Sequence, residues 1–462
     1  SPISPNLAVA PKPAFAHMVT ALTSPEKPVD DTWDKVYNWY KNHDEYKNRL
    51  HVIDDAKKNF TAHLTRERAQ KLYAQTQEYS ASRLEKFAEC PFKYFVSYGL
   101  SASERNSWQV QAFDIGSLMH YILKCFCEKV EEGKTDNTYA GIKAAWHKLD
   151  EDKINEIIND LLNSAHETIL KRDMQGKGRI KFLLSQIENT LRESAKIIYD
   201  SITQGEFTPI AYEQDFSKFK LISSSDKHTL LRGQIDRIDL IEDSDKVYIR
   251  IIDYKSGSKS FNLNDIYNNF SMQLVIYAQA AIELYKDGKL TNVSGKPVNI
   301  AGILYSSLKD DIAKENPPID EQTYSPSFKF NGLLLNNGNA LHYMDKDYSD
   351  KSACFTSEFF PFKTKKDGEL YSNSSVATAE NFDTLGKFVS ESINDINTQI
   401  HSGDISIRPY FEKSKNVCTF CPYGEICRFD AGKHKKRYAK TFGKGNSPWD
   451  CMNKVLDEKE DK

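Results

Sequence analysis

Two strand-like stretches that each end in a carboxylate constrain most strongly how this 462-residue chain can fold. The first begins near Leu230 and leads to Asp236, and the second begins at Val247 and leads to Asp253. Residues 241–245 between them read Ile-Glu-Asp-Ser-Asp, which is rich in turn formers, so we expect an antiparallel pair of strands. Asp236 and Asp253 can then approach each other at one end of a sheet.

A pair of carboxylates held this close needs a cation between them, because two neighbouring negative charges repel each other. Hard oxygen ligands suit Mg²⁺ or Mn²⁺. Lys255 lies two residues after Asp253, so both side chains emerge from the same face of a strand. An ammonium there can orient a water molecule or stabilise negative charge on a phosphate. Taken alone, an Asp-x-Lys pattern more often marks a hairpin with surface charges, so the assignment depends on the motifs around it.

Four motifs in this region together resemble those of the PD-(D/E)xK nucleases in their RecB-family form. They are Gly-x-x-x-His at 116–120, Gly-x-x-Asp at 233–236, Asp-Tyr-Lys at 253–255 and Gln-x-x-x-Tyr at 273–277. The resemblance implies a set of catalytic and metal-binding roles: His120 and Asp236 as metal ligands, Asp253 as a shared ligand, the Tyr254 backbone carbonyl completing the metal shell, and Lys255 as the catalytic lysine. Gln273 and Tyr277 lie one turn apart on a predicted helix, so both can face the site.

The cysteines form a second, independent pattern. There are eight, at Cys90, Cys125, Cys127, Cys354, Cys418, Cys421, Cys427 and Cys451. The triplet at 418–427 has the spacing Cys-x2-Cys-x5-Cys, and a soft metal centre needs a fourth thiolate from elsewhere. Cys90, followed by proline and surrounded by aromatic residues, is the obvious partner. The triplet alone favours zinc and iron–sulfur about equally. Cys125 and Cys127 lie in an apolar helical stretch, where buried thiols without a metal are the better interpretation.

This arrangement resembles the iron–sulfur nucleases, in which one cysteine before the nuclease core and three after it hold a 4Fe–4S cluster. The resemblance implies that Cys90, Cys418, Cys421 and Cys427 are the cluster ligands. The stretch between the first two (418 − 90 = 328 positions) encloses the whole predicted core. The cluster would therefore tie the two ends of the domain together and restrain the unfolded chain.

Further segments resemble the nuclease subunit of bacterial ATP-dependent helicase/nucleases, over nearly the whole chain. These segments are 34–40, 80–87, 303–305, 330–335 and 408–410. The resemblance implies a Mg²⁺-dependent DNA exonuclease of double-strand break repair and recombination, which cuts the strand that ends 5′. It also implies a partner subunit that carries the ATP-driven motor, since this chain has no Walker A pattern. Recognition of the Chi sequence would belong to a preceding part of such a subunit. Two alternatives are an inactive scaffold that binds single-stranded DNA and a CRISPR-adaptation-type nuclease.

Composition adds little about partners. The net charge of −3 gives no global sign of nucleic-acid binding, although the basic segment at 433–444 is either a solvated tail or a phosphate contact. The chain shows no signal peptide and no transmembrane run. Its unmatched, clustered cysteines indicate metal ligation in a reducing compartment, so we expect a cytoplasmic protein.

The expected fold is an α/β, restriction-endonuclease-like core: a mixed sheet flanked by helices, with a helical insertion and an iron–sulfur staple, preceded by a helical region. The periodicity predicts a loose lead at 1–30, helices at 31–75, helices carrying Cys90 and His120 at 80–130, a helical insertion at 140–203, strands at 210–219, 229–241, 247–254 and 300–306, an irregular insertion at 310–375, and a helix at 379–400. The predicted domains are 1–78 (helical), 79–430 (nuclease) and 431–462 (tail).

Overall fold

The computed structural model describes residues 10–23, 31–59, 62–74, 78–102, 112–172, 177–220, 229–257, 259–290, 294–308, 330–349, 353–412, 416–430, 434, 436–442 and 446–460. The chain divides into two compact units. Unit 1 contains residues 1–77, 82–105 and 395–441, and unit 2 contains residues 78–81, 106–394 and 442–462. The segments of unit 1 therefore lie on both sides of residues 106–394, the main segment of unit 2, in the sequence. This division differs from the predicted domains 1–78, 79–430 and 431–462.

Unit 2 is built on a six-stranded mixed sheet with the strand order β1-β2-β3-β4-β5-β6. The strands are β1 (Thr208–Lys220), β2 (Leu230–Glu242), β3 (Val247–Lys255), β4 (Val298–Ser307), β5 (Asn331–Leu335) and β6 (Val376–Ala377). The pairs β3–β4 and β5–β6 are parallel, and the other neighbouring pairs are antiparallel. The predicted mixed sheet is confirmed, and its four predicted strands correspond to β1 to β4.

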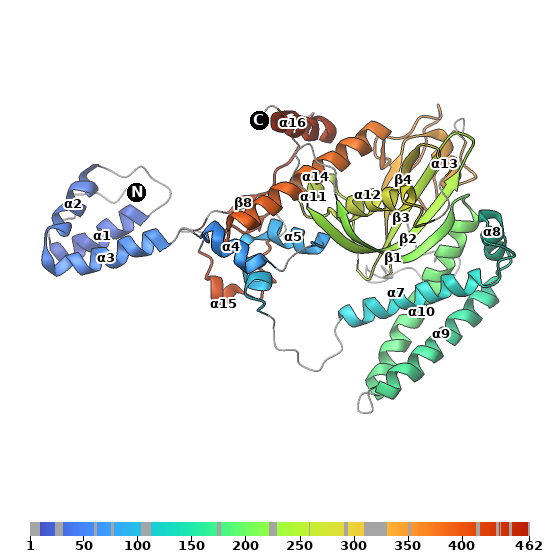
Figure 1. The fold of residues 1–462 in the computed structure, drawn as a ribbon, viewed down its shortest axis with the longest axis horizontal. Helices are drawn as coiled ribbons and strands as arrows, with labels where there is room; N and C mark the ends of the chain where they lie inside the picture. The colour runs from blue at the N-terminus through green and yellow to red at the C-terminus, as the bar shows by residue number, and fades with distance from the viewer. Residues whose placement is uncertain are drawn as a thin grey trace. The chain divides into compact units, whose positions relative to one another are not determined.

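Helices cover both faces of this sheet (Figure 1). On one side lie α7 (Ala112–Glu131), α8 (Tyr139–His147), α9 (Glu151–Arg172) and α10 (Lys177–Thr203), and on the other lies α12 (Gln273–Lys286). Strand β3 shows the reason. Its residues Tyr248, Ile252 and Tyr254 join the hydrophobic core formed with α7 to α10. Because side chains alternate along a strand, Asp253 points to the face that α12 covers.

The other elements surround these layers or belong to unit 1. Unit 2 also contains α11 (Leu263–Tyr267), α13 (Gly338–Met344) and α16 (Pro448–Glu460), and α14 (Ala379–Ser402) continues from unit 2 into unit 1. In unit 1, α1 (Pro11–Thr23), α2 (Asp31–Lys41) and α3 (Asp44–Asn59) enclose a small core around Met18, Trp33 and Tyr40. Its remaining elements are α4 (Arg66–Tyr73), α5 (Ala81–Glu89), α6 (Pro91–Tyr94), the π-helix η2 (Phe95–Gly99), α15 (Gly424–Cys427), β7 (Tyr410–Phe411) and β8 (Arg437–Tyr438).

Three sequence-based predictions of local structure were wrong. Residues 11–23 form helix α1 rather than a loose lead, because Pro11 and Pro13 lie in the first turn, where proline is tolerated. The region 310–375 contains β5 and α13, although 310–329 and 350–352 lie outside the described residues. The short β5 has a weak local pattern, and its pairing with β4 decides its conformation. Cys90 lies between α5 and α6 rather than within a helix.

In the part of the chain that the structure describes, no helix is long and apolar enough to cross a bilayer.

Candidate active site and cysteine pocket

The two predicted carboxylates meet at one end of the sheet. In the β2–β3 ladder Arg237 pairs with Ile252, so the same register sets Asp236 opposite Asp253. Both are buried, with Asp253 1% exposed and Asp236 8% exposed. The backbone N–H of Tyr254 donates a hydrogen bond to Asp236 Oδ2 over 2.6 Å. The antiparallel pairing predicted from the turn between the strands therefore brings these side chains together.

Their electrostatics fit a bound cation. Burial and the neighbouring Asp236 raise the pKa of Asp253 to about 6, although Lys255 and Lys259 act in the opposite direction. Two buried carboxylates destabilise each other's charged form, and a divalent cation between them would remove that penalty. Oxygen donors are the ligands that Mg²⁺ and Mn²⁺ prefer. The donor set at this end of the sheet therefore fits such an ion.

Gln273, the first residue of α12, connects Asp253 to Lys255. Its Nε2 donates to Asp253 Oδ1 over 3.0 Å, and its Oε1 accepts from Lys255 Nζ over 3.0 Å. Lys255 Nζ also lies 2.5 Å from Asp253 Oδ2. The amide of Gln273 thus fixes both the carboxylate and the ammonium. The same Nε2 donates to the Tyr277 hydroxyl over 2.8 Å, which joins the two residues of the predicted helix face.

Close packing explains the glycine at 233 and the tyrosine at 277. A Cβ on Gly233 would lie 2.7 Å from a ring carbon of Phe216 and 3.2 Å from a ring carbon of Tyr277. The rings of Phe216 and Tyr277 pack edge to face with centroids 5.7 Å apart. Only glycine leaves room for these rings over β2. Tyr277 therefore contributes packing against the Gly-x-x-Asp segment as well as its hydrogen bond to Gln273.

His120 reaches the site from α7. Its Nδ1 lies 3.4 Å from Asp236 Oδ2 and 3.6 Å from an oxygen of Glu213 on β1. Gly116, one turn earlier, faces the residue after Lys255, since a Cβ there would lie 3.3 Å from Ser256 Oγ. The Gly-x-x-x-His motif thus combines a close approach of α7 to the end of β3 with a histidine placed at the carboxylates.

Glu213 is a site residue that sequence reasoning missed. Among the described residues, only His120, Glu213 and Asp236 bring three possible ligand atoms within 4.8 Å of one another. Glu213 has a φ of +47°, a left-handed conformation that is uncommon for residues other than glycine. No motif spacing marks it. The register of β1 against β2 marks it, since Tyr212 pairs with Arg237 and Gln214 with Ile235, which leaves Glu213 opposite Asp236.

The two carboxylates also control the protonation of His120. Burial alone lowers the pKa of His120, but Asp236 and Glu213 outweigh this effect and raise it to about 10. A metal-ligating histidine is neutral, so a cation that takes this place releases a proton. Without a cation, the imidazolium itself compensates part of the negative charge.

On the face of the sheet opposite α12, buried charged side chains hold strands β2 and β3 together. Arg237 and Arg250 are fully buried and share the carboxylate of Asp239, with Arg250 Nη2 2.6 Å and Arg237 Nη2 2.9 Å from Asp239 Oδ2. Arg237 Nη1 also donates to the Tyr254 hydroxyl over 3.2 Å. Because a buried charge needs partners, this network fixes the alignment of β2 on β3 beneath the carboxylates.

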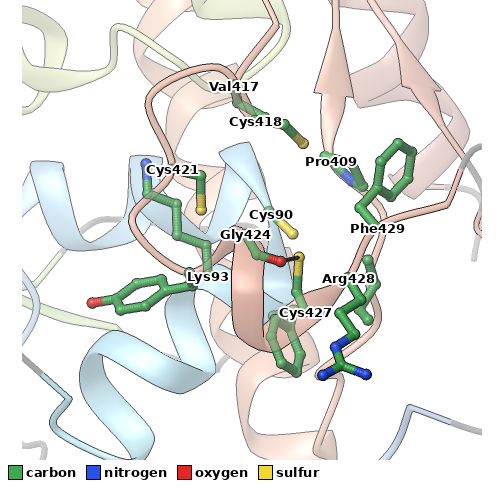
Figure 2. Close-up of a pocket in the computed structure, with 13 residues that line it drawn as sticks. Cys90, Lys93, Pro409, Val417, Cys418, Cys421, Gly424, Cys427, Arg428 and Phe429 are labelled. Carbon is green, nitrogen blue, oxygen red and sulfur yellow. Dashed lines mark hydrogen bonds between the residues drawn. The ribbon is translucent and has the colours of Figure 1, made fainter.

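The four predicted cluster cysteines surround one pocket of unit 1. Figure 2 shows the sulfur atoms of Cys90, Cys418, Cys421 and Cys427 turned toward a common space. The pocket has a volume of about 240 Å³ and is otherwise lined largely by apolar and aromatic residues, including Phe92, Ile407, Pro409, Val417 and Phe429. The structure therefore brings together the cysteines that sequence spacing grouped across 328 positions (418 − 90).

The chemistry of this pocket fits a metal ion or cluster held by thiolates. Burial raises the pKa of Cys90, while backbone N–H groups of Lys93, Phe92 and Arg408 act in the opposite direction by hydrogen bonding to it. Burial and the three other cysteines raise the pKa of Cys418 to about 11. Thiols that disfavour each other's ionisation bind a metal as thiolates once its positive charge is present.

The spacing of the sulfurs is wider than one zinc ion requires. Tetrahedral zinc with Zn–S bonds of about 2.3 Å holds its sulfurs about 3.8 Å apart. In the part of the chain that the structure describes, no three cysteine sulfurs lie within 4.8 Å of one another. Nearby, Nε and Nη2 of Arg437 are buried and find no hydrogen-bond acceptor among the described residues. The charge of Cys90 acts on this guanidinium. A centre that is larger than one zinc ion and carries negative charge fits both the spacing of the sulfurs and the unsatisfied guanidinium of Arg437.

The remaining cysteines lie apart from the pocket lining. Cys127 lies on α7 and is buried in the core that α7 covers, Cys354 is exposed, and Cys125 and Cys451 are half-buried.

In the basic segment at 433–444, residues 433, 435, 443 and 444 lie outside the described residues. Arg437 packs over the Tyr410 ring at 5.8 Å, and its buried guanidinium does not belong to a solvated basic surface.

Comparison with known families agrees with this geometry. A model of the PD-(D/E)XK nuclease superfamily matches residues 78–428. This chain therefore belongs to the PD-(D/E)XK nuclease superfamily. A model of the ATP-dependent helicase/deoxyribonuclease AddB fifth domain matches residues 5–53.

Similar curated proteins narrow the match to one kind of subunit. The chain is 32% identical over 443 residues to the B subunit of the ATP-dependent helicase/deoxyribonuclease of Clostridium tetani, and the match covers 93% of this chain and 37% of that protein. It is 34% identical over 423 residues to the protein of the same name in Clostridium kluyveri, with 89% of this chain and 35% of that protein covered. The predicted resemblance to AddB, the B subunit, is confirmed. The chain spans less than two fifths of the length of these relatives.

Proposed function

We propose that this chain is a metal-dependent DNA exonuclease domain of an AddB-like helicase/nuclease subunit. The observation that carries the proposal is the amide of Gln273, which joins Asp253 to Lys255 at the end of the sheet. Carboxylates that ligate a metal are themselves oriented by hydrogen bonds from outer-shell residues, and a catalytic ammonium has to be held in place beside them. The amide of Gln273 does both for Asp253 and Lys255. The arrangement favours hydrolysis of a phosphodiester over a passive scaffold.

Each residue of the site has a defined task in this proposal. His120, Asp236, Asp253 and the backbone carbonyl of Tyr254 would hold Mg²⁺ or Mn²⁺, with Glu213 beside them. When bound, the ion would polarise the phosphate and lower the pKa of a water molecule. Lys255 is held by Asp253 and Gln273 in the position from which it can orient the nucleophile and neutralise developing charge. Tyr277 holds Gln273 through its hydroxyl.

The cofactor and partners of this proposal follow from the resemblance and the cysteine pocket. Cys90, Cys418, Cys421 and Cys427 would bind a 4Fe–4S cluster, which the wide sulfur spacing and the unsatisfied guanidinium of Arg437 support. The cluster would join segments from both sides of the nuclease core within unit 1. We further propose an AddA-like partner subunit, DNA fed as a single strand from a duplex end, a role in recombinational repair, and a cytoplasmic location.

The polarity of digestion tests the proposal directly. We expect the 462-residue chain to shorten linear single-stranded DNA from its 5′ end in the presence of Mg²⁺. A 5′-labelled oligonucleotide should release small labelled products at once, whereas a 3′-labelled one should shorten gradually, and a chelator should stop both reactions. Circular single-stranded DNA is the control and should resist. Cleavage of the circle would indicate an endonuclease. A reversed label pattern would indicate digestion from the 3′ end, and the absence of cleavage would indicate a scaffold.

Gln273 gives a second test, which separates catalysis from packing. Gln273→Ala removes the bridge between Asp253 and Lys255, so we expect kcat to fall roughly 10–100-fold, as for the loss of a supporting partner of a metal ligand. Tyr277→Phe keeps the ring against Gly233 and removes only the hydroxyl. Loss of this one hydrogen bond should raise the activation free energy by about 1 kcal/mol, so we expect kcat to fall only several-fold. Steady-state kinetics and thermal melting measured together decide the matter: parallel losses of Tm and kcat would indicate that the helix face only packs.

A further inference from the structure

A second lysine lies at the active-site end of the sheet. Lys259 follows Lys255 by four residues, just beyond the end of β3. Its Nζ lies 4.8 Å from the centroid of the Tyr305 ring, and Lys255 Nζ lies 5.7 Å from the same centroid. Tyr305 belongs to β4 and pairs directly with Asp253. One ring therefore places two ammonium groups beside the carboxylates.

The two lysines have different surroundings. Lys255 is bound to Asp253 at 2.5 Å and to Gln273 at 3.0 Å, so its position is set by the catalytic residues. Lys259 is half-buried, and the face of Tyr305 attracts its ammonium. Lys259 therefore lies near the reacting position without being one of the motif residues.

A polyanionic substrate needs such a cation. The site presents the carboxylates of Asp236, Asp253 and Glu213, and the chain as a whole carries a net charge of −3. A bound metal ion would offset these carboxylates at the cut phosphate. Every other phosphate of the DNA strand is also negatively charged, so the phosphates next to it need positive charges from the protein. Lys255 is committed to the reacting position, whereas an ammonium further along the sheet end can bind a neighbouring phosphate.

We infer that Lys259 binds a backbone phosphate of the DNA strand next to the phosphate that is cut, and so positions the strand in the site. This inference rests on the nuclease function proposed above. Lys259 is a positioning residue: it contributes to binding and register of the strand, while Lys255 acts at the reacting phosphate. Because the contact is to the backbone, it is independent of DNA sequence.

The test combines kinetics with the salt dependence of binding, using the full 462-residue chain. We expect Lys259→Gln to raise KM for a linear oligonucleotide about 10-fold, the effect of roughly 1.4 kcal/mol, and to change kcat less than about 3-fold. Loss of one phosphate contact should also reduce the slope of log Kd against log salt by about 0.7 for a single strand. Lys259→Arg keeps the charge and should restore most of the affinity. An unchanged slope and KM, or a loss confined to kcat, would overturn the inference.

A control variant and a separate measurement of DNA binding distinguish the proposed phosphate contact from the proposed nuclease function. Lys286→Ala removes an exposed lysine at the far end of α12 (286 − 273 = 13 residues after Gln273, about 20 Å along the helix) and should leave KM unchanged. Binding is measured in the Lys255→Ala background, where the DNA stays intact. A wild-type chain that binds with the expected slope but never cleaves would contradict the nuclease function alone. A wild-type chain that cleaves while Lys259→Gln binds normally would contradict the phosphate contact alone.

Discussion

Asp253→Asn should abolish DNA cleavage while the metal-free protein stays folded and becomes at least as thermally stable as the wild type. The substitution removes the negative charge that a divalent cation would share with Asp236. Burial and the charge of Asp236 raise the pKa of Asp253, so the ionised carboxylate destabilises the folded state at neutral pH. Because the pKa of Asp253 is raised in the folded protein, ionisation of this carboxyl lowers the stability of the fold at pH values above that pKa. This loss of stability disappears as the pH falls below the pKa and the carboxyl becomes protonated. Asparagine removes the penalty at every pH.

Lys255→Ala should also abolish cleavage, with the opposite effect on stability. The ammonium of Lys255 lies 2.5 Å from Asp253 and compensates the charge of this buried carboxylate. Without the ammonium, the repulsion between Asp253 and Asp236 is uncompensated, so Tm should fall. Exonuclease assays with Mg²⁺, circular dichroism and thermal melting of both variants provide the measurement. Activity in either variant close to that of the wild type would contradict the assigned roles. A large loss of Tm in Asp253→Asn would show that the carboxylate is structural.

Replacement of any one pocket cysteine by alanine should remove iron and the brown colour and lower Tm. This applies equally to Cys90, Cys418, Cys421 and Cys427, because ligation is a joint property and three thiolates hold a cluster poorly. Iron and acid-labile sulfide content, the visible spectrum and thermal melting of anaerobically purified protein provide the measurement. The large enclosed loop makes the stability loss substantial, since closing it restrains the unfolded chain.

Two other cysteines serve as controls for this prediction. Cys354→Ala changes an exposed thiol and should leave iron content and Tm unchanged. Cys127 lies on α7 and its side chain is buried, so Cys127→Ala should lower Tm moderately while iron stays bound. Zinc in place of iron, or full iron content in Cys90→Ala, would contradict the cluster assignment.

The motifs were predictable because each depends on short spacing. The residue types and intervals of 116–120, 233–236, 253–255 and 273–277 are visible in the chain, and the structure brings all four segments to one end of the sheet. The strand and helix that carry Asp253 and Gln273 follow from local periodicity, which the backbone geometry translates directly into a face. The cysteine triplet was equally visible, and chemistry required a fourth partner.

Glu213 and the buried arginines were not predictable in this way. Glu213 reaches Asp236 through the register of β1 on β2, which depends on pairing between strands rather than on any local pattern. The charges of Arg237, Asp239 and Arg250 resemble those of a solvated hairpin in the sequence, yet all three are fully buried. Their burial depends on helices α7 to α10, which precede them in the chain and are brought over the sheet by long-range packing.

Residue types and short intervals already indicated the chemistry that we propose for the chain: a pair of carboxylates with a lysine, a histidine on a helix, and four thiols in a spacing that suits a metal. Those properties belong to residue types and short intervals, which any fold of the chain would keep. The contacts between these residues became visible in the folded chain: the amide of Gln273 bonded to Asp253 and Lys255, Glu213 beside His120, and Lys259 over the ring of Tyr305. Hydrogen bonds and close packing act only between side chains a few ångströms apart, and long-range strand pairing and helix packing set those distances.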